Sequence, residues 1–347
     1  STASHTTDLA YLGGSKKLTI DNTTINVSGG VAQSKGTAVV SPDLQITNSK
    51  IVVAGANDTL TLGGLADRNS VGGTQGLTSG DYTADTAAIK NSNISITSGT
   101  LNLGHEANTL QTKTSLNLTG NTIDNKGVIN AYGDVTVDTV AGLYGANGTL
   151  NLSGSTLTVT GAQAIDLSDT NAKIKADAGS TFKAENANVT IGNGFESKVP
   201  NLVAGTLTVK GDVNSAPDTS YQNRPFLVIN SGSVTALNEV KGSPKNTEIA
   251  VYNKKSGGSA TLTLGNADTT NGKLTDIARV YVGVGEAGMD STNTLNVNGK
   301  WDFGNAKLAV GNNGTLNINE GAEVSNSRCQ EHSERKRHFK DQALTCR

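Results

Sequence analysis

The sequence of 347 residues contains few of the side chains that fill an irregular hydrophobic core. Aromatic residues make up only 4% of it, and it has one tryptophan, one methionine and five prolines. A round core normally depends on large aromatic and methionine side chains to fill its volume. We therefore expect a narrow, regular interior built from leucine, valine, isoleucine and alanine.

Cysteine is nearly absent, and its placement is informative. Cys329 and Cys346 both fall in the last twenty residues, so residues 1–327 contain no cysteine. Small secreted domains are often stapled by disulfides. That framework is excluded for residues 1–327.

Charge and long apolar runs are also scarce. Charged residues make up 17% of the chain and the formal net charge is -2, whereas nucleic-acid binding normally leaves a strongly basic footprint. No apolar run reaches the roughly 18 residues that span a bilayer. We expect neither a nucleic-acid partner nor membrane insertion by this segment. The first residues, "STASHTTDLAYLGG", lack the basic start and apolar core of a signal peptide, so an exported form is expected to be a mature or excised piece.

What the sequence has instead is a short pattern that recurs along the chain. The stretch "NGTLNLSGSTLTVTG", residues 147–161, alternates aliphatic residues with asparagine and threonine between glycines. Such alternation, bounded by turn residues, predicts short half-buried strands that end in tight turns. Because no helical period is found, we predict an all-β protein. Similar segments begin at Leu18, Leu44, Thr59, Ile94, Gly99, Leu116, Gly205, Thr261, Val280, Thr294, Lys307 and Gly314.

The arrangement of these strands follows from their repetition. Self-similarity along more than 300 residues without a domain break favours a solenoid over a sandwich or barrel. We predict a parallel β-helix over residues 1–327, with about 16 coils of about 20 residues each. Residues 63–82 are rich in glycine, and residues 200–245 hold four of the five prolines. The first segment is predicted to form a loop extension because it lacks aliphatic alternation. The second is predicted to form one because proline is poor inside a sheet, with residues 212–226 bulging outward.

Residues 328–347, "RCQEHSERKRHFKDQALTCR", differ from the rest of the chain. Nine of these twenty residues are charged. We expect a non-native or frame-shifted tail without repeats. Two functional alternatives are a basic anchor and a zinc site, although the spacing of the zinc set is too loose to favour metal binding. The residues concerned are Arg335, Lys336, Arg337 and Lys340 for the anchor, and Cys329, His332, His338 and Cys346 for the zinc site.

One segment carries a resemblance to a known family. Residues 308–327, "LAVGNNGTLNINEGAEVSNS", combine an aliphatic strand, a Gly/Asn turn, "GTLNI" and a G-x-x-V step. This pattern resembles the passenger-associated strand repeat of bacterial autotransporters, with weaker copies at Gly99, Gly148 and Gly205. The matching positions are Leu308, Val310, Gly311, Asn313, Gly314, Thr315, Leu316, Ile318, Gly321 and Val324.

The resemblance implies a right-handed parallel β-helix, exported through the outer membrane of a Gram-negative bacterium and displayed on the cell surface. It also implies a function, because members similar to the self-associating adhesins mediate aggregation, biofilm formation and attachment to host surfaces. We expect this chain to correspond to part of such a passenger, without its signal sequence or membrane barrel.

The sequence contains few features that are typical of a catalytic site. The sequence has no G-x-S-x-G elbow, no H-E-x-x-H and no P-loop. His105 and Glu106 form the only histidine–acid neighbours outside the tail, and acids such as Asp166, Asp169 and Asp177 are scattered. We therefore expect no enzyme, no catalytic residue, no metal site and no cofactor, and a polysaccharide-cleaving β-helix is the less favoured reading.

Two binding hypotheses remain. In the first, outward polar side chains bind an identical chain on a neighbouring cell through many weak contacts. In the second, the proline-rich segment binds host matrix proteins or glycosaminoglycans. The candidates for self-association are Asn117, Thr119, Asn147, Thr149, Asn151, Thr156 and Thr158, and those for ligand binding are Tyr221, Arg224, Phe226, Lys241 and Lys245.

Overall fold

The computed structural model describes residues 10–13, 17–28, 37–63, 86–104, 113–215, 223–283 and 290–329. Across these ranges the regular elements are β-strands, apart from the single 3-10 turn η1 (Phe195–Ser197). The all-β prediction is confirmed. A search of the same ranges for a helix long and apolar enough to cross a bilayer finds none.

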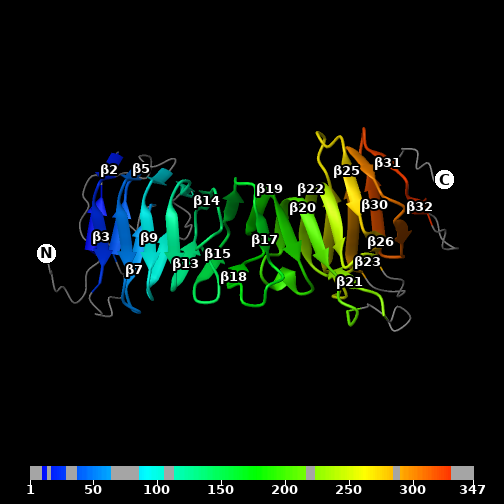
Figure 1. The fold of residues 1–347 in the computed structure, drawn as a ribbon, viewed down its shortest axis with the longest axis horizontal. Coiled ribbons are helices and arrows are strands. Elements are labelled where there is room, and N and C mark those ends of the chain that lie inside the picture. Colours follow the sequence, from blue (N-terminus) through cyan, green and yellow to red (C-terminus); the bar gives the residue numbers. More distant parts are fainter. Residues whose placement is uncertain are drawn as a thin grey trace. The chain divides into compact units, whose positions relative to one another are not determined.

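The chain divides into two compact units. Unit 1 comprises residues 1–161 and 171–181, and unit 2 comprises residues 162–170 and 182–347. Each unit is built from parallel strands that lie side by side in successive turns (Figure 1).

Unit 1 has three faces, which we call A, B and C, and the chain visits them in that order in each of its first four turns. Along each face the strands pair in parallel with the equivalent strand of the neighbouring turn. Face A contains β1 (Ala10–Gly13), β4 (Thr37–Val40), β7 (Thr59–Leu62), β10 (Thr100–Leu103), β13 (Val128–Ala131), β15 (Thr149–Leu152) and β18 (Ile174–Ala176). Face B contains β2 (Lys17–Asp21), β5 (Asp43–Thr47), β8 (Thr86–Lys90), β11 (Ser115–Asn117), β14 (Asp134–Val137) and β16 (Thr156–Val159). Face C contains β3 (Thr24–Val27), β6 (Lys50–Val53), β9 (Asn93–Ile96) and β12 (Thr122–Asn125).

Unit 2 also has three faces, which we call D, E and F. The long strand β22 contributes its first half to face E and its second half to face F. Face D contains β21 (Phe226–Ile229), β23 (Thr247–Val251), β26 (Ile277–Val282), β29 (Lys307–Val310) and β32 (Arg328–Cys329). Face E contains β19 (Thr181–Ile191), β20 (Asn201–Lys210), β22 (Gly232–Ser243), β24 (Ser259–Leu264), β27 (Thr292–Val297) and β30 (Gly314–Ile318). Face F contains β17 (Ala164–Asp166), the second halves of β19, β20 and β22, then β25 (Gly272–Thr275), β28 (Lys300–Asp302) and β31 (Glu323–Ser325).

This order of parallel strands confirms the predicted parallel β-helix class. The turns are longer than expected, because equivalent residues are 21 apart for Asn130 and Asn151 but 41 apart for Thr61 and Asn102. Faces B and E each contain six successive strands within the described ranges, which is fewer turns than the 16 predicted coils. The right-handed sense of coiling stays a prediction.

Aliphatic rows form the interior, as the alternation predicts. On face A, Leu60, Leu101, Ile129 and Leu150 are register partners in successive strands, and each is at most 1% exposed. Burial of one such side chain contributes roughly 2 kcal/mol. The intervening threonines and asparagines point outward and are half-buried.

The recurrent Asn-Ser dipeptides lie at the corners between faces B and C, where the backbone turns sharply. Asn22, Asn48 and Asn91 adopt left-handed φ angles of 49°, 49° and 50°, a conformation that asparagine tolerates better than most residues. The next residue in two of these corners is a buried serine whose hydroxyl accepts a backbone N–H from the preceding turn. The Thr23 N–H donates to Ser49 Oγ at 3.1 Å, and the Ser49 N–H donates to Ser92 Oγ at 3.0 Å.

The glycine that opens each "GTL" motif is required by close backbone approach. A Cβ added to Gly148 would lie 2.0 Å from the carbonyl oxygen of Asn125, and one added to Gly314 would lie 1.9 Å from that of Val282. Any side chain at these positions would push neighbouring turns apart. The glycine of the motif therefore marks a position where the backbone of one turn lies directly against the backbone of the previous turn.

The predicted loop extensions require correction. Residues 64–85 lie outside the described residues, so the extension near 63–82 is a prediction that the structure leaves open apart from Gly63. Most of residues 200–245 forms β20, β21 and β22, so an extension over the whole range is wrong. The predicted bulge at residues 212–226 falls between β20 and β21, and residues 216–222 lie outside the described residues. The prolines mark strand boundaries there, since Pro200 and Pro225 directly precede β20 and β21, and Pro244 directly follows β22.

The β-helix was predicted to end at residue 327, but parallel strand pairing continues beyond that residue. Arg328 and Cys329 form β32, which pairs in parallel with β29 on face D. The remainder of the predicted tail, residues 330–347, lies outside the described residues, and so do the anchor and most of the zinc set.

Asp177 offers a test of how neighbouring turns of unit 1 are joined. Its carboxylate accepts the Ser180 hydroxyl at 2.6 Å and the N–H groups of Gly154 at 2.8 Å and Gly179 at 3.1 Å. These bonds, the Ser180 hydroxyl first, hold the pKa of Asp177 below its ordinary value. Because the folded pKa is the lower one, the stabilisation is present above the unfolded pKa of about 3.9 and is lost as the pH falls through the folded pKa.

We expect Asp177→Ala to lower the free energy of unfolding by about 1 kcal/mol at neutral pH, a value discounted because the carboxylate is largely solvent-exposed. The difference from the parent chain should shrink below about pH 4. Thermal unfolding followed by circular dichroism at several pH values measures both effects. A difference that persists unchanged in acid would contradict a charge-dependent role.

Candidate interaction surface

The outward side of face A carries a row of hydrogen-bonded polar side chains, which we call the amide ladder: the hydroxyl of Thr61 and the amides of Asn102, Asn130 and Asn151. Asn151 Nδ2 donates to Asn130 Oδ1 at 2.9 Å, and Asn130 Nδ2 donates to Asn102 Oδ1 at 3.0 Å. Asn102 Nδ2 then donates to Thr61 Oγ1 at 3.4 Å. The four residues are register partners on β7, β10, β13 and β15. Parallel pairing therefore places one such group on every turn, about 4.8 Å from the next.

The amide ladder is not saturated by its own bonds. A side-chain amide has two N–H donors and an oxygen with two lone pairs, and each ladder bond uses one donor and one lone pair. Asn102, Asn130 and Asn151 are all half-buried, with none fully covered. The ladder thus presents a regular row of further donors and acceptors to a partner on face A.

Unit 2 has a similar row of hydrogen-bonded side chains on face E. Asn317 Nδ2 donates to Asn296 Oδ1 at 2.9 Å, and Asn296 Nδ2 donates to Thr263 Oγ1 at 3.3 Å. In both units each amide donates toward the preceding turn, and the row begins at a threonine. The parallel register of the strands places these groups beside one another in successive turns.

The residues predicted for self-association are divided between two faces of unit 1. Asn147 directly precedes Gly148 and β15, and Thr149 and Asn151 lie on β15 of face A. Asn117, Thr156 and Thr158 lie on face B, and Thr119 follows β11. Asn117 Oδ1 is occupied by the N–H and hydroxyl of Thr119, at 3.0 Å and 2.8 Å. The structure therefore brings only part of the predicted set onto one surface.

Sequence reasoning missed Thr61, Asn102 and Asn130. A signal was present, since the "TLNL" of residues 100–103 recurs at residues 149–152. Alignment of these copies places Asn102 and Asn151 in one outward row. Asn130 lies in "VINA" and needs the strand register to join them.

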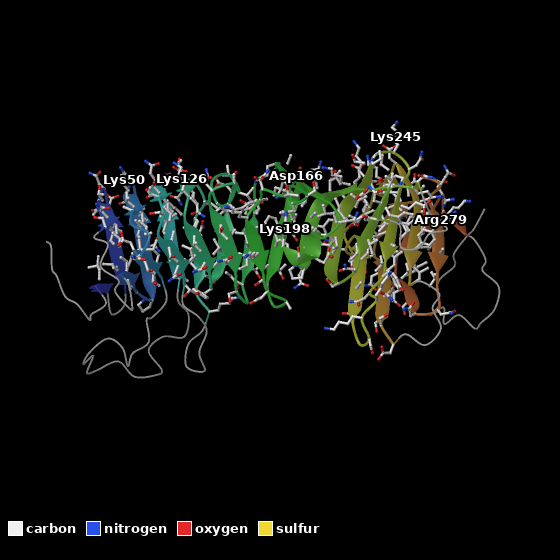
Figure 2. The ribbon with its side chains drawn as sticks, turned by 90° about the horizontal axis from the view of Figure 1, so that it is seen from below. Lys50, Lys126, Asp166, Lys198, Lys245 and Arg279 are labelled. Carbon is white, nitrogen blue, oxygen red and sulfur yellow. The ribbon has the colours of Figure 1, made fainter. Side chains whose placement is uncertain are left out.

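The residues predicted for ligand binding fare differently. Phe226 is fully buried, with its ring 5.9 Å from that of Tyr281, so its assignment as a ligand contact is wrong. Arg224 Nη1 contacts Glu248 Oε1 at 3.1 Å, which makes it part of an ion pair. Tyr221 lies outside the described residues. Lys241 on β22 and Lys245 after it are exposed, and Figure 2 shows the Lys245 side chain pointing away from the ribbon.

Comparison of the chain with family models, with curated proteins and with solved structures gives no match. The amide ladder and the fold are therefore the basis for any functional argument.

A shallow polar depression of about 370 Å³ lies on unit 2, where β19 and β20 carry register shifts. Its lining includes Gln163, Asn186, Asn188, Asn238, Glu185 and Thr206. Gly205 also lines the depression. A larger residue does not fit at this position, because an added Cβ would lie 2.3 Å from the carbonyl oxygen of Glu185. The depression is open and amide-rich, like the ladder surfaces.

Several acidic side chains of the described ranges accept hydrogen bonds from neighbouring N–H and hydroxyl groups. The four carboxyls with a shifted pKa are Asp21, Asp43, Asp177 and Asp290, and hydrogen bonds lower each of the four pKa values. Asp166, drawn in Figure 2, accepts the N–H and hydroxyl of Ser168 at 2.8 Å and 2.6 Å. Within the described ranges no group of three or more His, Cys, Asp or Glu residues is placed to hold a metal ion. His105 and Glu106 lie outside those ranges.

Proposed function

We propose that this chain is part of a bacterial cell-surface adhesin that binds a second copy of itself through the amide ladder of face A. Such binding promotes aggregation, biofilm formation and attachment to host surfaces. The observation that carries the proposal is the row of half-buried, unsaturated amides on Asn102, Asn130 and Asn151. Neutral amides are self-complementary, because each one both donates and accepts.

The energetics suit contact between cells. Each intermolecular amide bond contributes about 1 kcal/mol net, so one ladder of four groups supplies roughly 4 kcal/mol, which is no more than the freedom that two chains lose when they associate. A single pair of chains is therefore weakly bound. Display of many copies on one cell converts weak pairs into strong attachment through multivalency.

Export to the cell surface is the part of the proposal supported by the resemblance of residues 308–327 to the autotransporter passenger repeat. These residues correspond to most of one turn of unit 2, since they cover all but the first residue of β29, then β30 and β31.

Charge substitution on the ladder tests the proposal. Asn130→Asp/Asn151→Asp places like charges on both partners, and we expect cells displaying this variant to settle at the rate of cells without the chain. Asn93→Asp/Ser95→Asp adds the same two charges to the outward side of face C and should leave settling unchanged. Settling curves and biofilm mass measure the effect, and circular dichroism of the purified variants checks folding.

Equal loss of settling in both double variants would show that face A is not the binding surface. Undiminished settling of the face A variant would show that the amide ladder does not bind.

Glycosaminoglycan or matrix-protein binding is a second candidate function. Of its predicted residues, Lys241 and Lys245 are exposed, Arg224 is ion-paired, and Tyr221 lies outside the described residues. Lys241 is exposed, and its register partners on β20 and β25 are Thr208 and Thr275, which carry no charge. Cells that fail to settle but still bind immobilised sulfated glycan would favour this candidate over self-association.

A further inference from the structure

Five asparagines of the chain are followed directly by glycine. In such a pair the glycine has no side chain to shield its backbone nitrogen, so this nitrogen can attack the carbonyl carbon of the asparagine amide when both groups are unengaged. The structure describes all five pairs and therefore sorts them by accessibility. The asparagines are Asn147, Asn193, Asn271, Asn298 and Asn313.

Two of the five amides are held at both ends. Asn193 Nδ2 donates to the Phe226 carbonyl at 2.9 Å, while its Oδ1 accepts the Val228 N–H at 2.9 Å. Asn298 Nδ2 donates to the Gly265 carbonyl at 3.2 Å, while its Oδ1 accepts from Asn319 Nδ2 at 2.6 Å. Attack on either side chain requires two hydrogen bonds to break first.

Two further pairs are restrained in other ways. Asn313 Nδ2 donates to Ser291 Oγ at 2.9 Å, and its Oδ1 is buried. The following Gly314 N–H donates to the Gly311 carbonyl at 3.1 Å, so the attacking nitrogen is engaged too. Asn271 Nδ2 donates to Thr270 Oγ1 at 3.3 Å, and Gly272 is part of β25.

Asn147 is the exception. It is exposed in the bend that precedes β15, a bend closed by the Gly145 N–H donating to the Gly148 carbonyl at 3.0 Å. Within the described part of the chain, neither the Asn147 amide nor the Gly148 N–H makes a hydrogen bond. Gly148 is buried and Asn147 is exposed, but neither reacting group has to break a hydrogen bond before the attack.

We propose that Asn147 is a self-modification site, at which the folded chain converts a neutral amide into a carboxylate. The Gly148 nitrogen loses its proton and bonds to Cγ of Asn147, the bond from Cγ to Nδ2 breaks, and ammonia leaves. Water then opens the resulting succinimide at either carbonyl, giving aspartate or isoaspartate. The net reaction consumes one water and releases one ammonia, with no change of oxidation state.

The modification has a consequence for face A that rests on the proposed function. Asn147 lies in the bend before β15, the strand that carries Asn151, so the new negative charge appears at the start of a ladder strand in both partners. Like charges oppose self-association. An isoaspartate would also lengthen the backbone at Gly148, where a Cβ would lie 2.0 Å from the Asn125 carbonyl oxygen and space is already lacking.

Peptide mapping by mass spectrometry tests the proposal. The folded chain is incubated at mildly alkaline pH, and the loss of amide at each Asn–Gly pair is followed over time. We expect Asn147 to react at least about tenfold faster than Asn193 and Asn298, because two bonds of about 1 kcal/mol each protect the latter. The urea-unfolded chain is the matched control, and there all five pairs should react at similar rates.

Reaction at Asn147 no faster than at the other four pairs of the folded chain would overturn the proposal, as would faster reaction elsewhere. Asn147→Gln should abolish the mass change at that position, since a longer side chain cyclises poorly. The readout is a mass and not cell settling, so it stands apart from the proposed adhesion. Settling of cells that display Asn147→Asp examines only the consequence for face A.

Discussion

Replacing Trp301 by alanine should lower the free energy of unfolding of unit 2 by about 3–5 kcal/mol. Trp301 is the only tryptophan of the chain, is 2% exposed, and lies on β28. Its Nε1 donates to the Asn298 carbonyl at 3.1 Å. Its ring occupies the space over Gly272, where an added Cβ would lie 2.4 Å from Cε2 of the indole. Alanine leaves a cavity and one unpaired carbonyl group in place of this packing.

Chemical denaturation followed by circular dichroism measures the loss, and peptide-level hydrogen exchange locates it. We expect the protection of β25 and β31 to fall most, since these strands pair with β28. Val310→Ala is the control for removing an apolar group from a side chain that is 41% exposed, and it should change stability by less than about 0.5 kcal/mol. Equal effects of the two substitutions would show that Trp301 is not a packing centre.

The fold was predictable because each strand buries the side chains of one face and exposes those of the other to solvent, which produces an alternating sequence. Leu60 and Leu62 alternate with Thr59 and Thr61 on β7, and burial alternates in the same way. When such segments repeat along a chain with few aromatic residues, the fold that buries all their aliphatic faces is a stack of similar turns. The pattern is local, so the sequence alone carries it.

The number of residues per turn was not predictable in the same way. Turn length depends on how much chain passes between one face and the next, and corners tolerate insertions because they lie on the surface. Asn130 and Asn151 are 21 residues apart, whereas Thr61 and Asn102 are 41 apart. Both pairs are equivalent in the structure, and only strand register reveals it.

Burial on face D was also beyond the alternation pattern. All five residues of β23, "TEIAV", are buried, so its outward side chains are covered as well as its inward ones. A polar residue in such a strand looks solvent-facing from sequence. Glu248 is such a residue, being 5% exposed despite its charge. Phe226, on β21 of the same face, was assigned to a ligand because it lies in the proline-rich segment, and it is buried as well.

The interaction surface was predictable in kind but not in detail. Asparagine and threonine at outward positions indicate a polar face, and the sequence places Thr149 and Asn151 there. A ladder, however, requires amides from separate turns to come within hydrogen-bond distance. That depends on parallel register among β10, β13 and β15, which no local motif encodes.

Glu248 leads to the second large effect, since we expect Arg224→Ala to destabilise unit 2 by about 2 kcal/mol. The Glu248 side chain is 6% exposed and the Arg224 side chain 46% exposed. Removing the arginine leaves a buried carboxylate whose Oε2 already lacks a hydrogen-bond partner. Loss of one partner from a fully buried pair costs about 3–5 kcal/mol, and exposure of Arg224 reduces the figure because water screens the pair.

A double-mutant cycle with Glu248→Gln isolates the interaction. If the cost of Arg224→Ala comes from the unpaired charge, the double variant should recover most of the lost stability, because glutamine carries no charge to bury. Lys183→Ala breaks the exposed pair with Glu185, whose side chains are 40% and 47% exposed, and should change stability by at most about 1 kcal/mol. Urea denaturation of the four members of the cycle supplies the energies. A double variant as unstable as Arg224→Ala alone would assign the loss to packing of the arginine stem and not to charge.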